Sequence, residues 1–255
     1  MQDLTVTLVQ ANQIWEEKEA NYRNYSNILK SIKQPTDLII LPEMFDTGFS
    51  MNIQLAETWE KNASLDYLLE LAAEYNAAIY TSMMVKINDT IFNRGVFIFP
   101  TGKIETYDKR KSFNLGGEDK YYTPGNTETI VNFRDWKINL QICYDLRFPE
   151  IARNYEIVGI PKYDLLLYVA NWPTTRIEHW NILLKARAIE NQSYVIGVNR
   201  FGQDGHNLLY SGNSSIIDPL GKIECKLENQ MIFTSTLSKL TLINTRISLP
   251  FLKDY

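Results

Sequence analysis

Apolar and polar residues alternate in short segments along the first third of the chain, and these segments are separated by stretches of helical character. Residues 4–10 alternate as a half-buried strand does, and residues 37–41 form a short apolar run. Residues 16–32, between them, have helical composition. The same order returns in residues 64–76, predicted as a helix, and residues 78–85, predicted as a strand. The pattern therefore predicts a βαβαβ opening.

The middle of the chain is rich in strand patterns. Residues 91–99 and 103–107 flank a Pro-Thr-Gly turn signal, which predicts a hairpin. Residues 129–133 and 136–142 form another strand pair, and the second strand runs directly into Cys143. Its position at the end of a predicted strand makes Cys143 a candidate catalytic residue.

The last part of the chain returns to alternating helices and strands. A helix is expected after Phe148-Pro149, over residues 151–158, because proline suits the first helical turn. A buried strand at 164–170, a helix at 176–192 and a strand at 194–198 follow. Three more strands are expected, at 214–217, 222–226 and 231–236. The pattern predicts an α/β fold with two sheets covered by helices, in one domain spanning residues 1–255.

Composition and charge exclude several classes of function. The net charge of −4 gives no general electrostatic reason to bind nucleic acid or an anionic membrane. No stretch approaches the roughly 20 apolar residues of a membrane span. The start of the sequence lacks the basic and apolar regions of a signal peptide, so we expect a cytoplasmic protein.

The chain has few residues of the types that bind metals or form disulfides. With two cysteines, Cys143 and Cys225, at most one disulfide could form. With two histidines, His179 and His206, a His-rich metal site is excluded. Cys225 has no motif around it and is expected to be structural. Catalysis, if present, needs other residue types.

Cys143 occupies a position suited to a nucleophile. It lies where an apolar strand meets a polar turn, so its side chain would be exposed at the end of the sheet. Backbone N–H groups at such a junction can bind a developing oxyanion. The alternative is a small buried hydrophobic residue, which is the usual role of a free cysteine. Position alone does not decide between the two.

A thiol nucleophile needs a base or a positive charge nearby, because its pKa near 8.5 leaves little thiolate at neutral pH. Glu43 follows the apolar residues 38–42, and Lys109 ends the strand that begins at residue 103. Each could equally be a solvated surface charge. A Cys–His pair with His179 or His206 is possible, although neither histidine lies in a suggestive motif.

Taken together, three segments resemble the catalytic motifs of the nitrilase (carbon-nitrogen hydrolase) superfamily. They are LPE at 41–43, YDK at 107–109 and CYDLRFPE at 143–150. Further similarity spans nearly the whole chain, including Asn93 and residues 170–173 and 187–191. The chain looks closest to the omega-amidase branch, whose members cleave the terminal amide of 2-oxo acid monoamides such as 2-oxoglutaramate and 2-oxosuccinamate. Lys111-Ser112 departs from the His-Leu that relatives often carry after the lysine.

The resemblance implies a role for each motif residue. Cys143 would be the nucleophile, Glu43 the base, and Lys109 with the backbone N–H of Tyr144 would bind the oxyanion. Glu118 resembles a glutamate often called a fourth catalytic member; the alternative is a solvated loop carboxylate. The chemistry would proceed through a thioester and would need no metal or organic cofactor.

Candidate residues for substrate binding are less firmly indicated. Asn171, Trp172 and Pro173 follow a buried strand and are expected to line the mouth of a pocket, or else to form a structural turn. Arg147 could hold a substrate carboxylate through its bidentate guanidinium, or it could only hold the site together. No other residue is assigned to the pocket.

The resemblance also implies an α-β-β-α sandwich of two mixed sheets and association into dimers or larger homo-oligomers through outer helices. Residues 151–158 and 176–192 are the candidate helices, and the tail from about residue 241 is expected to contact a partner subunit. Other readings remain open. They are another amidase, carbamoylase or nitrilase with the same triad, a non-catalytic metabolite- or partner-binding relative, and an unrelated α/β protein.

Overall fold

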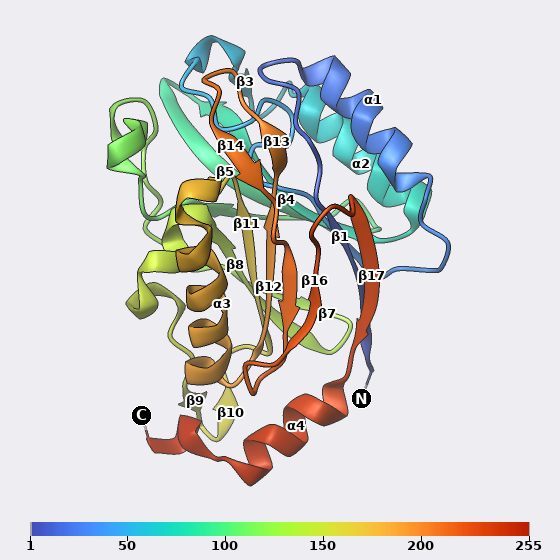
Figure 1. The fold of residues 1–255 in the computed structure, drawn as a ribbon, viewed down its shortest axis with the longest axis vertical. Coiled ribbons are helices and arrows are strands. Elements are labelled where there is room, and N and C mark those ends of the chain that lie inside the picture. Colours follow the sequence, from blue (N-terminus) through green and yellow to red (C-terminus); the bar gives the residue numbers. More distant parts are fainter. Residues whose placement is uncertain (1, 255) are drawn as a thin grey trace.

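Two β-sheets packed face to face form the centre of the protein, as a computed structural model that describes residues 2–254 shows (Figure 1). The larger sheet contains β1 (Leu4–Val9), β2 (Leu38–Ile40), β3 (Glu57–Thr58), β4 (Ala78–Ile87), β5 (Thr90–Ile98), β6 (Ile104–Asp108) and β17 (Ile232–Leu237). The smaller sheet contains β7 (Ile130–Phe133), β8 (Trp136–Ile142), β11 (Leu165–Ala170), β12 (Tyr194–Asn199), β15 (Ser215–Ile217) and β16 (Ile223–Lys226).

Both sheets are mixed. The larger has the order β17-β1-β2-β4-β5-β6, with β3 also paired to β4, and the smaller has the order β16-β15-β12-β11-β8-β7. Strands β1, β2 and β4 run parallel to one another, and so do β8, β11 and β12. The strands next to these, β17 and β5 in the larger sheet and β15 and β7 in the smaller, are antiparallel to them. The carboxyl ends of three parallel strands therefore come together in each sheet.

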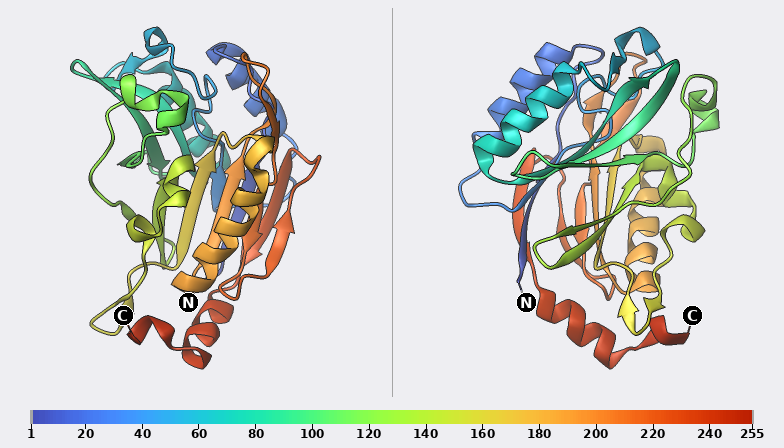
Figure 2. Two further views of the ribbon diagram at one scale, coloured as in Figure 1. Left: turned by 60° about the vertical axis from the view of Figure 1, so that its left-hand side comes forward. Right: turned by 180° about the vertical axis from the view of Figure 1, so that it is seen from behind.

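Helices cover the outer faces of the two sheets (Figures 1 and 2). Helices α1 (Lys18–Leu29) and α2 (Ala63–Tyr75) pack on the larger sheet, and α3 (Ile177–Asn191) packs on the smaller. The predicted four-layer α-β-β-α sandwich is thus confirmed. Among residues 2–254, no helix is long and apolar enough to cross a membrane.

The alternation in the strands explains why two apolar layers form. In β1, the side chains at positions 4, 6 and 8 belong to the core between the sheets, and in β4 Ala78 and Tyr80 do the same. Ile79 and Val85 of β4 instead face the layer beneath α1 and α2. Side chains of a strand alternate between its two faces, so one strand can bury both.

Local signals set the ends of α2 within a residue of the prediction. The Asn62 side chain accepts a hydrogen bond from the backbone N–H of Leu65 at 3.0 Å, which caps the first turn. At the other end Asn76 adopts φ 46°, the left-handed conformation that commonly terminates a helix. The βαβαβ opening is confirmed.

The predicted helix over residues 151–158 is wrong. After a single 3-10 turn at Pro149–Ala152, the chain forms a small hairpin of β9 (Glu156–Ile157) and β10 (Ile160–Pro161). Asn154 explains the interruption, because its side-chain oxygen accepts from the backbone N–H of Lys162 and its side-chain nitrogen donates to the backbone oxygen of Asn191. Such side-chain bonds to the backbone compete with the helix.

The C-terminal segment folds back on the smaller sheet's end. Helix α4 (Lys239–Ser248) buries Leu242 and Thr245, and its residue Arg246 donates to Asp164 Oδ1 at 2.7 Å. The last described residues form a 3-10 turn at Phe251–Asp254. Contact of this tail with a partner subunit stays a prediction.

Candidate active site

Residues that follow four strands meet where the two sheets face each other. Glu43 follows β2 and Lys109 follows β6 in the larger sheet; Cys143 follows β8 and Asn171 follows β11 in the smaller. The structure brings Glu43, Lys109 and Cys143 together with Glu118, all of them buried. Glu43, Lys109, Cys143 and Glu118, which the sequence analysis grouped together, therefore also lie together in the structure.

Cys143 lies on a sharp turn between β8 and a 3-10 helix at Cys143–Arg147. Its φ of 45° is unusual for a residue with a side chain. The first N–H groups of a helix lack partners within it, and Tyr144 lies in the first turn of this 3-10 helix. The predicted nucleophile-elbow geometry is present.

Asp145 holds this turn against the lysine-bearing strand. Its carboxylate accepts hydrogen bonds from the N–H of Ile142 (3.0 Å), the hydroxyl of Tyr107 (2.8 Å) and the N–H of Lys111 (2.9 Å). Burial raises the pKa of Asp145 to about 6. The carboxylate thus connects the segment that carries Cys143 to the one that carries Lys109.

Both carboxylate oxygens of Glu43 have fixed partners. Oε1 accepts from Lys109 Nζ at 2.9 Å and from Asn93 Nδ2 at 2.8 Å, and Oε2 accepts from the backbone N–H of Asn171 at 2.8 Å. The Gln13 side chain donates to the Glu43 backbone oxygen at 2.9 Å. Glu43 is consequently oriented by residues that follow the ends of β6 and β11, by one residue within β5 and by one loop residue.

Lys109 lies between two carboxylates. Its ammonium is 2.9 Å from Glu43 Oε1 and 2.9 Å from Glu118 Oε1, and the three side chains are at most 2% exposed. Burial opposes the charge of Lys109, but Glu118 and Glu43 outweigh it and raise its pKa well above the ordinary value. Lys109 is therefore a permanent cation and not a proton donor at neutral pH.

The electrostatics at Cys143 do not favour a resting thiolate. Burial, followed by the negative charge of Glu43, raises the pKa of the Cys143 thiol well above its usual value, although Lys109 acts in the opposite direction. The resting group is a thiol. Attack by the sulfur thus requires proton transfer to a base, and the neighbouring Glu43 side chain is the candidate for that base.

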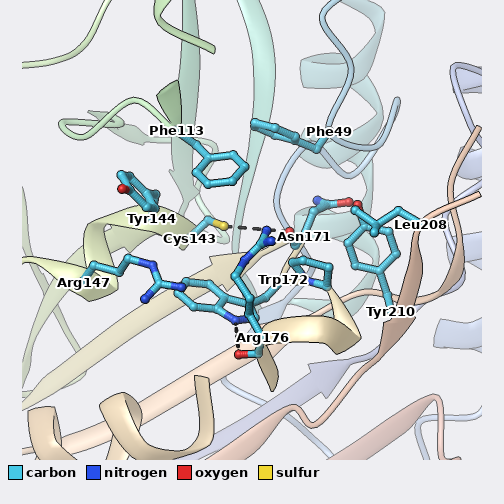
Figure 3. Close-up of a pocket in the computed structure, with 11 residues that line it drawn as sticks. Phe49, Phe113, Cys143, Tyr144, Arg147, Asn171, Trp172, Arg176, Leu208 and Tyr210 are labelled. Atoms are coloured by element: carbon cyan, nitrogen blue, oxygen red, sulfur yellow. Dashed lines mark hydrogen bonds between the residues drawn. The ribbon is translucent and has the colours of Figure 1, made fainter. Parts of the chain in front are cut away.

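A small pocket opens above Cys143, with a cavity of about 50 Å³ (Figure 3). The four predicted residues Arg147, Asn171, Trp172 and Pro173 line it. The Cys143 sulfur lies 4.0 Å from the backbone oxygen of Asn171. The remaining lining residues are Phe49, Phe113, Tyr144, Arg176, Leu208 and Tyr210.

Known proteins share both the sequence and the fold of this chain. The profile of the Carbon-nitrogen hydrolase family matches residues 5–237. The chain belongs to the carbon-nitrogen hydrolase family. It is 43% identical to the omega-amidase YafV of Yersinia enterocolitica over 89% of this chain and 86% of the relative. It is 35% identical to the 2-oxoglutaramate amidase of Paenarthrobacter nicotinovorans over 86% of this chain and 78% of that one.

A solved structure agrees over the full length. XC1258 from Xanthomonas campestris, a CN-hydrolase superfamily protein with an arsenic adduct in its active site, superposes with a TM-score of 0.97 at 38% identity. The match covers 100% of this chain and 98% of that one. The helical layers and both sheets of the present hydrolase are thus those of an established fold.

Several residues of this hydrolase site were missed in the sequence. Phe49 and Leu208 come from loops and Tyr210 from the short strand β14 (Leu209–Ser211), and nothing in their local patterns marks them. Arg176 lies three residues after Pro173, so the motif that identified the pocket mouth was the available signal. Asn93 was recognised only as part of the resemblance, yet its amide nitrogen bonds to both Glu43 (2.8 Å) and Glu118 (3.3 Å).

The histidines and the second cysteine take no direct part in this geometry. His179 contacts the Arg147 guanidinium, with both Nη atoms 3.2 Å from its Nδ1, and His206 packs against the ring of Trp15. Cys225 lies on β16, and burial raises its pKa to about 11. These contacts favour the carboxylate–lysine arrangement over a Cys–His pair.

Proposed function

We propose that this carbon-nitrogen hydrolase is an omega-amidase that releases ammonia from small 2-oxo dicarboxylic acid monoamides through a cysteine thioester. The observation that carries the proposal is the buried group of Glu43, Lys109 and Glu118 beside the Cys143 thiol. Similarity to an omega-amidase and to a 2-oxoglutaramate amidase supports the choice of substrate.

In the first half of the reaction, the Cys143 sulfur attacks the amide carbonyl carbon while its proton passes to Glu43. Lys109 and the Tyr144 N–H stabilise the negative oxygen of the tetrahedral intermediate. The C–N bond then breaks, and Glu43 returns the proton to the departing nitrogen, which leaves as ammonia. The products of this half are a thioester on Cys143 and free ammonia.

In the second half, water replaces the sulfur. Glu43 removes a proton from the water, whose oxygen attacks the thioester carbonyl, and the same two groups stabilise the oxyanion. When this intermediate collapses, the C–S bond breaks and the 2-oxo dicarboxylate leaves; Glu43 gives its proton to the departing sulfur, which restores the Cys143 thiol. Glu118 holds Lys109 in place through its 2.9 Å contact and needs no change of protonation.

The pocket fits a small linear substrate. Its walls include aromatic rings of Phe49, Phe113 and Trp172, which would pack against a short carbon chain. Guanidinium groups at its rim provide a site for a carboxylate. Arg147 is one of them, as the sequence suggested.

The test is ammonia release across a panel of 2-oxoglutaramate, 2-oxosuccinamate, simple aliphatic amides, N-carbamoyl amino acids and nitriles. We expect kcat/KM to be highest for the two 2-oxo monoamides. A clear preference for nitriles or carbamoyl compounds would contradict the omega-amidase assignment and favour one of the other superfamily reactions.

We further propose that the enzyme works in the cytoplasm, as a homodimer or larger homo-oligomer, without a metal or organic cofactor. The exposed residues Ile182 (61%) and Ile189 (54%) on one face of α3 support association through this helix. Sedimentation equilibrium of the purified protein tests the assembly: a monomer at micromolar concentration would contradict it.

A further inference from the structure

The pocket contains a second guanidinium group that the catalytic steps above do not use. Arg176 lines the pocket together with Cys143 and Arg147. Its half-buried side chain extends toward Phe113, with 5.3 Å between the guanidinium carbon and the ring centre (Figure 3). Within residues 2–254, neither arginine forms an ion pair with a carboxylate; the buried pairs of the site all involve Lys109. Two cations thus line one small pocket without an anion.

The two arginines are held differently. Arg147 places both Nη atoms 3.2 Å from His179 Nδ1 and lies over the Trp172 ring at 4.7 Å, so protein groups already occupy its guanidinium. Arg176 is fixed through its backbone, whose oxygen accepts from Trp172 Nε1 at 2.8 Å. The base of the Arg176 side chain is therefore anchored while its N–H groups remain available to a ligand.

The two charges also influence each other. Burial and then the positive charge of Arg176 lower the pKa of the Arg147 guanidinium. Among the described residues that line the pocket, two are arginines and none is a carboxylate. An amide with a carboxylate at its far end would therefore meet two positive charges when its amide lies at Cys143.

We propose that Arg176 binds the far carboxylate of the substrate and is the residue that makes this hydrolase select acidic amides over neutral ones. Arg147, stacked on Trp172, positions the same carboxylate from the side. A guanidinium suits this task because its planar fork can donate two parallel hydrogen bonds to a carboxylate. The inference rests on the proposed function for the identity of the substrate, but not for the presence of the anion site.

The first test compares an acidic substrate with a neutral one of the same length. We expect Arg176→Gln to lower kcat/KM for 2-oxoglutaramate by about 10- to 100-fold, the range for a lost hydrogen bond to a charged group. With the C1 methyl ester of 2-oxoglutaramate as substrate, the kcat/KM of the variant should equal that of the wild type. Arg176→Lys keeps the positive charge but not the planar guanidinium. Its kcat/KM for 2-oxoglutaramate should therefore lie between those of the wild type and Arg176→Gln. Arg23→Gln, which removes an exposed arginine on α1, is the matched control and should not change either value.

An equal loss on the acid and the ester would overturn the proposal, because it would mean that Arg176 only shapes the pocket. Unchanged kcat/KM for the acid in Arg176→Gln would overturn it as well. The two substrates thus separate recognition of charge from a structural role.

A second test does not depend on turnover. The rate at which iodoacetamide alkylates Cys143, followed by peptide mass spectrometry, is measured with and without 2-oxoglutarate, and with its dimethyl ester as the neutral control. We expect 2-oxoglutarate to protect the wild type but not Arg176→Gln. Equal protection of both proteins, or none in the wild type, would contradict the anion site. Absence of ammonia release from every 2-oxo monoamide would instead contradict the proposed function and leave this second result to decide the role of Arg176.

Discussion

Two groups of three charged residues join distant parts of this chain, and they differ in sign and burial. In the active site, Lys109 lies between Glu43 and Glu118, and the side chains are at most 2% exposed. At the C-terminal helix, Asp164 lies between Lys239 and Arg246 at 2.7 Å each, and those side chains are 11–13% exposed. One group has an excess carboxylate and the other has an excess cation.

The difference in sign has opposite effects on the central residue and its neighbours. In the active site, the carboxylates raise the pKa of Lys109, and Glu43 adds to burial in raising that of the Cys143 thiol. At the C-terminal group, burial acts to raise the pKa of Asp164, but Lys239 and Arg246 outweigh it and lower the pKa. The first group thus prepares a proton transfer, whereas the second secures α4 against the smaller sheet.

The largest effect is expected for Glu43→Gln, which removes the proton acceptor and leaves the side-chain shape. We expect kcat to fall by about 10²- to 10⁴-fold, the usual contribution of general acid–base catalysis. The rate of ammonia release at saturating 2-oxoglutaramate measures this fall in kcat. Activity within a few-fold of the wild type would show that another group takes the proton.

Lys109→Met should have the next largest effect. The variant loses the cation that stabilises the oxyanion, for which a loss of about 10²- to 10³-fold in kcat is expected. It also leaves two buried carboxylates without their shared cation, so urea unfolding should show reduced stability. A variant that is fully folded and retains wild-type kcat would contradict the role of the lysine in the comparison.

Asp164→Asn should affect stability without affecting catalysis. Removing one partner of a largely buried ion group costs about 3 kcal/mol of unfolding free energy. Because the pKa of Asp164 is lower in the folded protein than its ordinary 3.8, its contribution is present above that pH and is lost as the pH falls through the lower folded value.

Urea unfolding at pH 7 and at pH 3 measures this difference between Asp164→Asn and the wild type. It should be smaller at pH 3 than at pH 7, while kcat at pH 7 stays unchanged. A stability difference that is the same at both pH values would show that packing, rather than charge, is responsible.

The smallest effect is expected for Cys225→Ser. Cys225 is half-buried on β16, and no catalytic residue contacts it in the described structure. We expect unchanged kcat and a change in unfolding free energy of about 0.5 kcal/mol or less, as for ordinary peripheral substitutions. Loss of activity would mean that the second cysteine matters to the site.

Strand order and site chemistry were predictable to different degrees. Period-2 patterns located most strands, because each buries one or both faces, and the motif residues at strand ends were brought together as predicted. The helix over residues 151–158 could not be excluded, since the side chain that ends it, Asn154, bonds to Lys162 and to Asn191, which are distant in sequence.

The pocket walls were less predictable than the catalytic group. A base, a cation and a thiol need particular residue types, so their candidates could be recognised. Phe49 and Tyr210 contribute shape, which many residue types provide, and only the fold brings their segments to the pocket. Arg176 has a charge, but only the three-dimensional structure shows that no carboxylate among residues 2–254 forms an ion pair with it.

The central claim is that Cys143 forms a thioester with the acyl part of the substrate. The most direct measurement is mass spectrometry of the peptide that contains Cys143 after acid quenching of the enzyme during turnover of 2-oxoglutaramate. We predict an added mass equal to the substrate less ammonia on that peptide, and its absence from Cys143→Ser. An adduct on another residue, or full ammonia release by Cys143→Ala, would contradict the account.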